Sequence, residues 1–265
     1  MDLRLTFNSD PDSYDRLRPT YSDQLFKDLI DFSKLDSNME ALEIGIGTGQ
    51  ASTPILETGC RVTAIEIGDQ LAEFSRIKFS NYNNLNVIIQ DFEKINLDAN
   101  TYDLIYSASA FHWIPIESGL PKVLKLLKSG GVFAWFSIQP SPAKEHWHIH
   151  DELQKVYSKY SEYFSQHKSK QDPEKIRSDI QKKLTSRIDD FKKYSFTDVY
   201  DETYCGSRTF KAKDYAELIS TFSDHKIIPS KIRTAFLDEI VEAINKCGGE
   251  FTLSDTVILC MGRKK

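Results

Sequence analysis

A short glycine-rich stretch after an apolar run constrains the fold of this chain more than any other feature. It reads Glu43-Ile44-Gly45-Ile46-Gly47-Thr48-Gly49-Gln50, an acidic residue followed by three glycines that alternate with other residues. Glycine lacks a Cβ atom, so the backbone can turn sharply and let a ligand approach closely, and a helix that follows offers free N–H groups in its first turn. We therefore expect a strand, a ligand-binding loop and a helix in this order.

The spacing of the glycines distinguishes two classes of cofactor. The dinucleotide fingerprint G-x-G-x-x-G would need glycine at position 50, where this chain has Gln50. A carboxylate at Glu43 would repel a pyrophosphate but would suit an amine-bearing ligand such as S-adenosylmethionine (SAM). The pattern favours SAM. The alternatives are an NAD(P) oxidoreductase, a SAM-binding protein without catalysis, and a glycine-rich turn without a ligand.

Two later strands end in acids that suit an adenosine. Residues 61–67 form a β-branched, buried strand whose Glu66 lies about 20 residues beyond the first glycine, where a carboxylate can accept hydrogen bonds from ribose hydroxyls. A third apolar strand, residues 85–92, ends in Asp91 and Phe92. Asp91 suits the exocyclic amine of adenine and Phe92 the border of its ring. The alternatives are a surface Glu66, an Asp91 that caps the next turn, and a Phe92 in the core.

The order of these motifs, followed by Tyr102–Ser109 and Leu126–Phe133, resembles the class I SAM-dependent methyltransferases, and most of all the type 11 methyltransferase domain of the small-molecule branch. The resemblance is dense over residues 38–138 and weaker elsewhere, where a Ser223-Asp224-His225 step and a strand near 256–261 still look like the family. It implies that the glycine loop holds the methionine part of SAM, Glu66 the ribose, and Asp91 with Phe92 the adenine. The cofactor-binding residues expected are Tyr14, Arg18, Glu43, Gly45, Gly47, Gly49, Glu66, Ile67, Asp91, Phe92 and Ser107.

Tyr14 and Arg18 enter this set because their segment, before the first long helix, resembles the one that folds over the methionine end of SAM in this family. The planar guanidinium of Arg18 suits the SAM carboxylate or an acidic substrate. A surface arginine before a helix is an equal alternative.

The acceptor side of the site is expected after the fourth strand, where the chain reads Ser107-Ala108-Ser109-Ala110-Phe111-His112-Trp113-Ile114-Pro115. The Asn/Asp-Pro-Pro-aromatic motif of amide and base N-methylating enzymes is missing, and so is the Pro-Cys pair of a cytosine C5 enzyme. His112 is the candidate catalytic residue, since an imidazole can accept a proton from a hydroxyl or amine. Phe111, His112 and Trp113 are the expected substrate pocket, and a His112 that packs beside Trp113 is an equal alternative.

The expected reaction transfers the methyl group of SAM to an O or N atom of a small molecule. A carboxylate acceptor needs no base. A hydroxyl or amine would need a helper, for which His112 or Tyr106 is the candidate.

Alternating strand and helix patterns, together with the resemblance, predict an α/β fold: a Rossmann-like, seven-stranded, doubly wound sheet with helices on both faces and an antiparallel last strand. We expect one domain over residues 1–265, with a core over 38–139, a helical cap insertion after the fifth strand over about 140–195, and C-terminal strands and helices over 196–265. The expected elements include a helix over 22–32, a helix ending near Gly59, an N-cap at Asp69, a helix closed by Gly130-Gly131, helices over 213–222 and 232–246, and strands over 132–138, from about 207, and over 253–261.

Composition excludes several classes of protein. The formal net charge is −5 and hydrophobic residues make up 40% of the chain, so we expect a globular protein with no nucleic-acid partner. Four scattered cysteines without C-x-x-C spacing fit reduced thiols. The first residues have no apolar signal region and no apolar run reaches about 18 residues, so we expect a cytoplasmic protein without a membrane partner, a monomer or weak homodimer.

The stretch His146-Trp147-His148-Ile149-His150 suggests a metal site at first sight. The segment opens a helical, polar insertion, so we expect no metal and a solvated or pocket-facing cluster instead.

Overall fold

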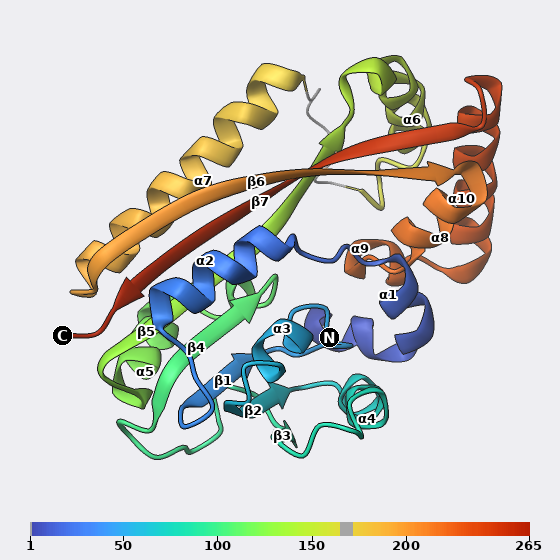
Figure 1. Cartoon of the computed structure of the whole chain (residues 1–265). Coiled ribbons are helices and arrows are strands. Elements are labelled where there is room, and N and C mark those ends of the chain that lie inside the picture. The colour runs from blue at the N-terminus through green and yellow to red at the C-terminus, as the bar shows by residue number, and fades with distance from the viewer. Residues whose placement is uncertain (1, 165–171) are drawn as a thin grey trace. The chain divides into compact units, whose positions relative to one another are not determined.

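A seven-stranded sheet forms the frame of the computed structural model, which describes residues 2–164 and 172–265 (Figure 1). The strand order is β3-β2-β1-β4-β5-β7-β6; the first five strands are parallel and the last is antiparallel, as predicted. The strands are β1 (Glu40–Ile44), β2 (Arg61–Glu66), β3 (Leu85–Ile89), β4 (Tyr102–Ala108), β5 (Leu127–Pro142), β6 (Thr197–Lys211) and β7 (Glu250–Arg263).

Helices alternate with the strands in the first half of the chain and dominate the second. They are η1 (Leu3–Ser9), α1 (Pro11–Leu17), α2 (Asp23–Ser33), α3 (Ser52–Leu56), α4 (Asp69–Lys78), η2 (Phe111–Trp113), α5 (Ile116–Leu126), η3 (Lys144–His146), α6 (Trp147–Lys159), α7 (Pro173–Lys193), α8 (Ala212–Ser220), α9 (Ser223–Lys226) and α10 (Ser230–Lys246). In the described part of the chain, no helix is long and apolar enough to cross a membrane.

The chain divides into two compact units, each of which draws on three separate segments. The sheet unit comprises residues 19–138, 180–204 and 257–265, and the helical unit comprises the described parts of 1–18, 139–179 and 205–256. Three of the boundaries fall within β5, β6 and β7, one falls within α7, and one falls between α1 and α2. The predicted insertion, about 140–195, is helical where described, but α6 belongs to the helical unit and most of α7 to the sheet unit.

The sheet unit buries both faces of its sheet, which is the property that makes the fold doubly wound. Side chains alternate along β5: Phe136 packs in one cluster with Phe26 and Leu29 of α2, and Phe133 packs in another with Leu120 of α5. Strand residues point to opposite faces in turn, so a strand covered on both sides reads as a continuous apolar run.

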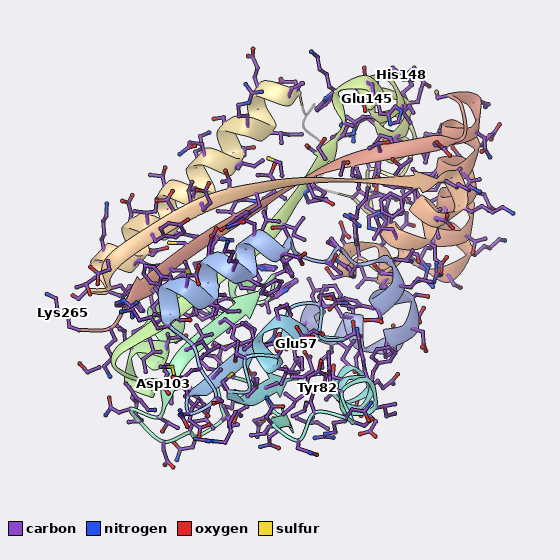
Figure 2. The ribbon with its side chains drawn as sticks, in the orientation of Figure 1. Glu57, Tyr82, Asp103, Glu145, His148 and Lys265 are labelled. Atoms are coloured by element: carbon purple, nitrogen blue, oxygen red, sulfur yellow. The ribbon has the colours of Figure 1, made fainter. Side chains whose placement is uncertain are left out.

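The amino ends of two parallel strands are tied together by a charged side chain. Asp103, at the start of β4, accepts hydrogen bonds from the backbone N–H of Glu40 (2.9 Å) and from Lys128 Nζ (2.7 Å) (Figure 2). At the opposite edge of the sheet, the carboxyl end of β1 leads into the glycine loop (residues 45–49). The carboxyl end of β4 leads into the His112 segment (residues 109–113).

The helical unit has its own apolar core, built from α6, α8 and α10 with Phe251 of β7. Within it, the Tyr157 hydroxyl and His225 Nε2 are 2.9 Å apart, and His225 Nδ1 lies 2.7 Å from Asp224 Oδ1. His225 is almost fully buried, so this chain of hydrogen bonds satisfies an imidazole that has lost contact with water.

Several predicted boundaries were wrong. Gly130-Gly131 does not close a helix but lies inside β5, which begins at Leu127 because α5 already ends at Leu126. Asp69 is the first residue of α4, and its N-cap is Gly68. The sixth strand begins at Thr197, ten residues before the predicted start, because its exposed polar residues lack the apolar alternation that marks a strand.

Candidate functional site

The glycine loop adopts the backbone shape that only glycine tolerates well. Gly45, Gly47 and Gly49 have φ values of 76°, 57° and 82°. A Cβ atom on Gly45 would lie 2.4 Å from Ala110 Cβ, and one on Gly49 would lie 2.1 Å from the ring of Phe79. The loop therefore leaves no room for side chains on these two sides, and the Gly45–Ala110 approach places it directly against the His112 segment.

Glu66, at the carboxyl end of β2, holds the backbone of two loops. Its Oε2 accepts from Gly47 N–H (2.8 Å) and its Oε1 from Gly68 N–H (2.9 Å). Burial raises the pKa of this carboxyl, and the backbone hydrogen bonds oppose that rise. The carboxylate thus lies beside the glycine loop, where the predicted ribose contact would need it.

Glu43 lies buried at the end of β1, directly before the loop. Its Oε2 accepts hydrogen bonds from Ser52 Oγ (2.7 Å) of α3 and from the Tyr106 hydroxyl (2.8 Å) of β4. Burial raises its pKa to about 7, although both hydrogen bonds act in the opposite direction. No local pattern predicts Ser52 and Tyr106 as partners of Glu43, because those contacts join different elements. Burial therefore favours the protonated form of Glu43 more than that of an exposed glutamate.

Asp91 and Phe92 have the contacts that we described as the structural alternative. Asp91 Oδ1 accepts from Glu93 N–H (3.0 Å) and caps the turn after β3, and the Phe92 ring belongs to a core cluster. Ser107 donates to the Ile44 carbonyl (2.9 Å) and links β4 to β1. The contacts predicted between these three residues and the cofactor stay predictions, as does that of Ile67, which is half-buried after β2.

His112 lies in η2, the turn that follows β4, with its ring 5.2 Å from that of Trp113. Part of its surface is exposed. Partial burial of the imidazole and, after it, the nearby cations Arg187 and Lys183 lower the pKa of His112 to about 4. His112 is therefore a neutral imidazole at pH 7 and a weaker base than an ordinary histidine.

The two aromatic neighbours of His112 differ in place. Phe111 is fully buried, with its ring 4.9 Å from that of Phe133 and 5.1 Å from that of Trp135. Its apolar ring completes the core beneath η2, so of the three predicted pocket residues only His112 and Trp113 keep exposed surface.

Tyr14 and Arg18 belong to the helical unit. The Arg18 guanidinium stacks over the rings of Tyr14 and Phe222, 4.8 Å from each centroid, and donates to the Thr221 carbonyl (3.0 Å). The structure brings these two residues together, and their contact with SAM stays a prediction.

The histidine stretch takes part in local structure. His146 Nδ1 accepts from the backbone N–H of Thr252 (2.8 Å) and so ties the start of the insertion to β7. Within residues 2–164 and 172–265, no group of three or more His, Cys, Asp or Glu residues could hold a metal ion. The four cysteines are free thiols.

Sequence reasoning missed Arg187, a buried arginine on α7 that donates to Ser137 Oγ (2.6 Å) on β5. One sequence feature points to a buried polar contact here: Phe133, Trp135 and Ser137 alternate along β5, so a hydroxyl follows two aromatic side chains on the same face of the strand. Its partner lies 50 residues further along the chain, in a helix whose register against the sheet no local pattern reveals.

Comparisons with known proteins agree with this geometry. A family model described as a methyltransferase domain matches residues 42–135. An uncharacterized methyltransferase of Schizosaccharomyces pombe is 23% identical over 243 residues, which cover 90% of this chain and 88% of the relative. A malonyl-[acyl-carrier protein] O-methyltransferase of Acetivibrio thermocellus is 30% identical over 138 residues, 50% of this chain and 48% of the relative. This chain spans about half the length of several other curated relatives.

Solved structures share the fold. A protein of Anaeromyxobacter dehalogenans, named as a candidate type II methyltransferase, superposes with a TM-score of 0.61 at 18% identity, covering 93% of this chain and 97% of its own. The phosphoethanolamine N-methyltransferase 2 of Haemonchus contortus, in complex with phosphomonomethylethanolamine and S-adenosylhomocysteine, gives a TM-score of 0.56 at 12% identity, covering all of this chain and 60% of its own. Residues 42–135 of the chain thus match a methyltransferase domain, and the whole chain shares the fold of solved methyltransferase structures.

Proposed function

We propose that this chain transfers the methyl group of SAM to an O or N atom of a small-molecule acceptor. The observation that carries the proposal is the glycine loop, with three left-handed glycines at the carboxyl end of β1 and the Glu66 carboxylate bound to its backbone. The positive φ values of these glycines let the loop turn sharply at the carboxyl end of β1, the edge at which ligands bind in open α/β sheets. The names of the relatives point the same way, since one is an O-methyltransferase and a structural neighbour is an N-methyltransferase.

The residues around the loop fit the parts of SAM. Glu66 can accept from ribose hydroxyls while it keeps Gly47 in place, because a carboxylate has about four lone-pair sites. Glu43 can supply a negative charge to the cofactor's ammonium group, since its pKa of about 7 lets a nearby cation drive off its proton. When bound, SAM supplies a methyl group on a positively charged sulfur. The protein then has to align the acceptor atom behind that methyl and exclude water.

Calorimetry on the full-length protein tests the proposal. SAM and S-adenosylhomocysteine should both bind measurably, and NAD should bind far more weakly. No heat with either sulfur ligand would overturn the proposal, tight binding of NAD alone would favour an oxidoreductase, and binding without turnover over a broad set of acceptors would favour a non-catalytic SAM-binding protein.

We propose His112 as the group that takes a proton from a hydroxyl or amine acceptor. General-base catalysis contributes about 10²–10⁴-fold, so His112→Ala should lower kcat by that much and leave the Kd for SAM nearly unchanged. The exposed His148 (Figure 2) provides a matched control, His148→Ala, which should leave both constants unchanged.

The pH dependence gives an independent measurement. The imidazole resonances of His112, assigned by their loss in His112→Ala, should titrate with a midpoint near pH 4. Because the neutral form is the base, the rate should be flat from about pH 6 to 8 and fall toward pH 4. A wild-type rate in His112→Ala would mean that the imidazole only packs beside Trp113 and that the acceptor needs no base.

A further inference from the structure

Arg187 is a buried cation that has no carboxylate partner within residues 2–164 and 172–265. Only 6% of the residue is exposed, and its Nη2 and Nη1 groups donate to Ser137 Oγ (2.6 Å) and the Ile258 carbonyl (3.3 Å), both neutral acceptors. Among the described residues, no Asp or Glu forms an ion pair with it. Buried charges are costly unless paired, so most arginines at this depth lie against an acid.

A second unsatisfied donor lies against the same guanidinium. The Arg187 Cζ atom lies 4.2 Å from the centroid of the Trp135 ring, and Trp135 is 6% exposed. The Nε1–H group of Trp135 is buried and has no hydrogen-bond partner within the described chain. Leaving such a buried donor unsatisfied is costly, and the stacking keeps this N–H group close to the guanidinium.

The surroundings of this pair are positive and adjoin the candidate acceptor site. Arg187 and Lys183 both lower the pKa of His112, which shows that the three groups share one electrostatic environment. Burial lowers the pKa of Arg187 itself to about 10, so it stays charged at neutral pH. All of these residues belong to the sheet unit, on the carboxyl side of β4 and β5, where Ala110 contacts the glycine loop.

We propose that Arg187, with the indole N–H of Trp135 as a second donor, binds a carboxylate group of the methyl acceptor. The acceptor would then be an organic acid, held by its carboxylate beside His112. This inference rests on the proposed methyltransferase function and narrows its substrate to one chemical class.

The geometry favours a carboxylate over a phosphate. The planar guanidinium fork matches both groups. Lys183 is exposed to solvent, so Arg187 is the buried cation of this site and balances one negative charge, whereas a phosphate monoester carries nearly two at neutral pH. A purely structural role leaves two features unexplained. The hydrogen bonds from Arg187 to Ser137 and Ile258 fix α7 against the sheet, but they require neither a buried charge nor an indole N–H group without an acceptor.

The test observes the indole resonance of Trp135 directly by two-dimensional NMR of the ¹⁵N-labelled full chain, assigned by its loss in Trp135→Phe. Benzoate and succinate should shift this resonance saturably, whereas benzamide, a neutral isostere, should not. In Arg187→Met the Kd for the carboxylates should rise by about 10–100-fold, the loss expected for a charge-assisted hydrogen bond. Ser137→Ala, which leaves the cation in place, should change the Kd by less than about threefold.

The outcomes separate this inference from the proposed function. A spectrum of Arg187→Met with native dispersion shows that the variant is folded. If Arg187→Met does not fold, Arg187→Lys replaces it in the test, and this variant, which keeps the charge, should retain part of the affinity for the carboxylates. No saturable shift with either carboxylate, or a shift that survives Arg187→Met, overturns the inference. A shift with methyl phosphate alone assigns the site to phosphates and overturns it too. Calorimetry with SAM on the same samples reports the methyltransferase proposal separately.

Discussion

The two buried glutamates at the strand ends, Glu43 and Glu66, differ in how their hydrogen bonds are distributed over the carboxylate oxygens. Glu66 has a hydrogen bond from a backbone N–H on each oxygen, whereas both hydrogen bonds to Glu43 reach one oxygen, Oε2. An ionised carboxylate has two oxygens to satisfy, so Glu66 is the better prepared to stay charged. Glu66 is therefore a carboxylate that supports the loop, whereas the charge of Glu43 depends on pH.

The raised pKa of Glu43 couples its proton to the stability of the fold. Burial raises its folded-state pKa from 4.5 to about 7, so the folded protein binds this proton more tightly than the unfolded chain. The stabilisation by protonation is complete below pH 4.5 and lost as the pH rises to about 7. Between pH 5 and pH 8, the unfolding free energy of the wild type should fall by about 2–3 kcal/mol more than that of Glu43→Gln. Urea denaturation at both pH values measures the difference, and equal slopes would show that Glu43 is not perturbed.

The second prediction concerns Glu66 and the ribose. Glu66→Ala should weaken SAM binding by about 1.5–3 kcal/mol, the range for hydrogen bonds to a charged group. Glu57, exposed after α3 (Figure 2), offers the control Glu57→Ala, which should bind SAM like the wild type. An unchanged dissociation constant for Glu66→Ala would mean that Glu66 supports the loop without contacting the cofactor.

At the scale of elements, the loop between β1 and α3 depends on close packing as well as on backbone freedom. Gly49 has φ 82° and its missing Cβ faces the Phe79 ring at the end of α4, whereas Gly130 in β5 has φ 78° and open space around the same position. The two glycines share a backbone conformation and differ in their neighbours. They form a matched pair for separating the two effects.

Gly49→Ala should therefore lower the unfolding free energy by about 1–3 kcal/mol more than Gly130→Ala, the usual cost of overpacking. Both variants share the strain of an alanine at positive φ, so the difference isolates the contact with Phe79. Denaturant unfolding of the two proteins measures it. Equal losses would show that the Phe79 ring moves aside freely.

Strand length shows where element-scale patterns fail. The buried parts of β5 and β7 follow apolar runs, and both were found by pattern. β6 has a single buried residue, Phe210, among fifteen, so it lacks the alternation that marks a half-buried strand. Its neighbours in the sheet, rather than its own side chains, set its conformation.

At the scale of the whole molecule, three chain segments build each unit, so neither unit can be removed by a single cut. The cap role of residues 140–195 remains a prediction. If it is right, amide hydrogen exchange in α6 and α7 should slow when both SAM and an acceptor are present, because lids order when ligands bind. Mass spectrometry with α10 as the internal reference measures this. Slowing confined to the glycine loop would mean that these helices do not cover the site.

The alternating fold, the glycine loop and the acids at the strand ends could be predicted from the sequence, because these depend on local chain properties: glycine at positive φ, apolar periodicity, and the edge at which parallel strands end. The partners of the site residues follow from tertiary packing. Ser52 and Tyr106 meet at Glu43, Phe92 and Phe111 turn into the core, and Arg187 lies on Trp135. Each of these contacts joins elements distant in sequence, and their register depends on the packing of many side chains at once, which no single stretch of the chain encodes.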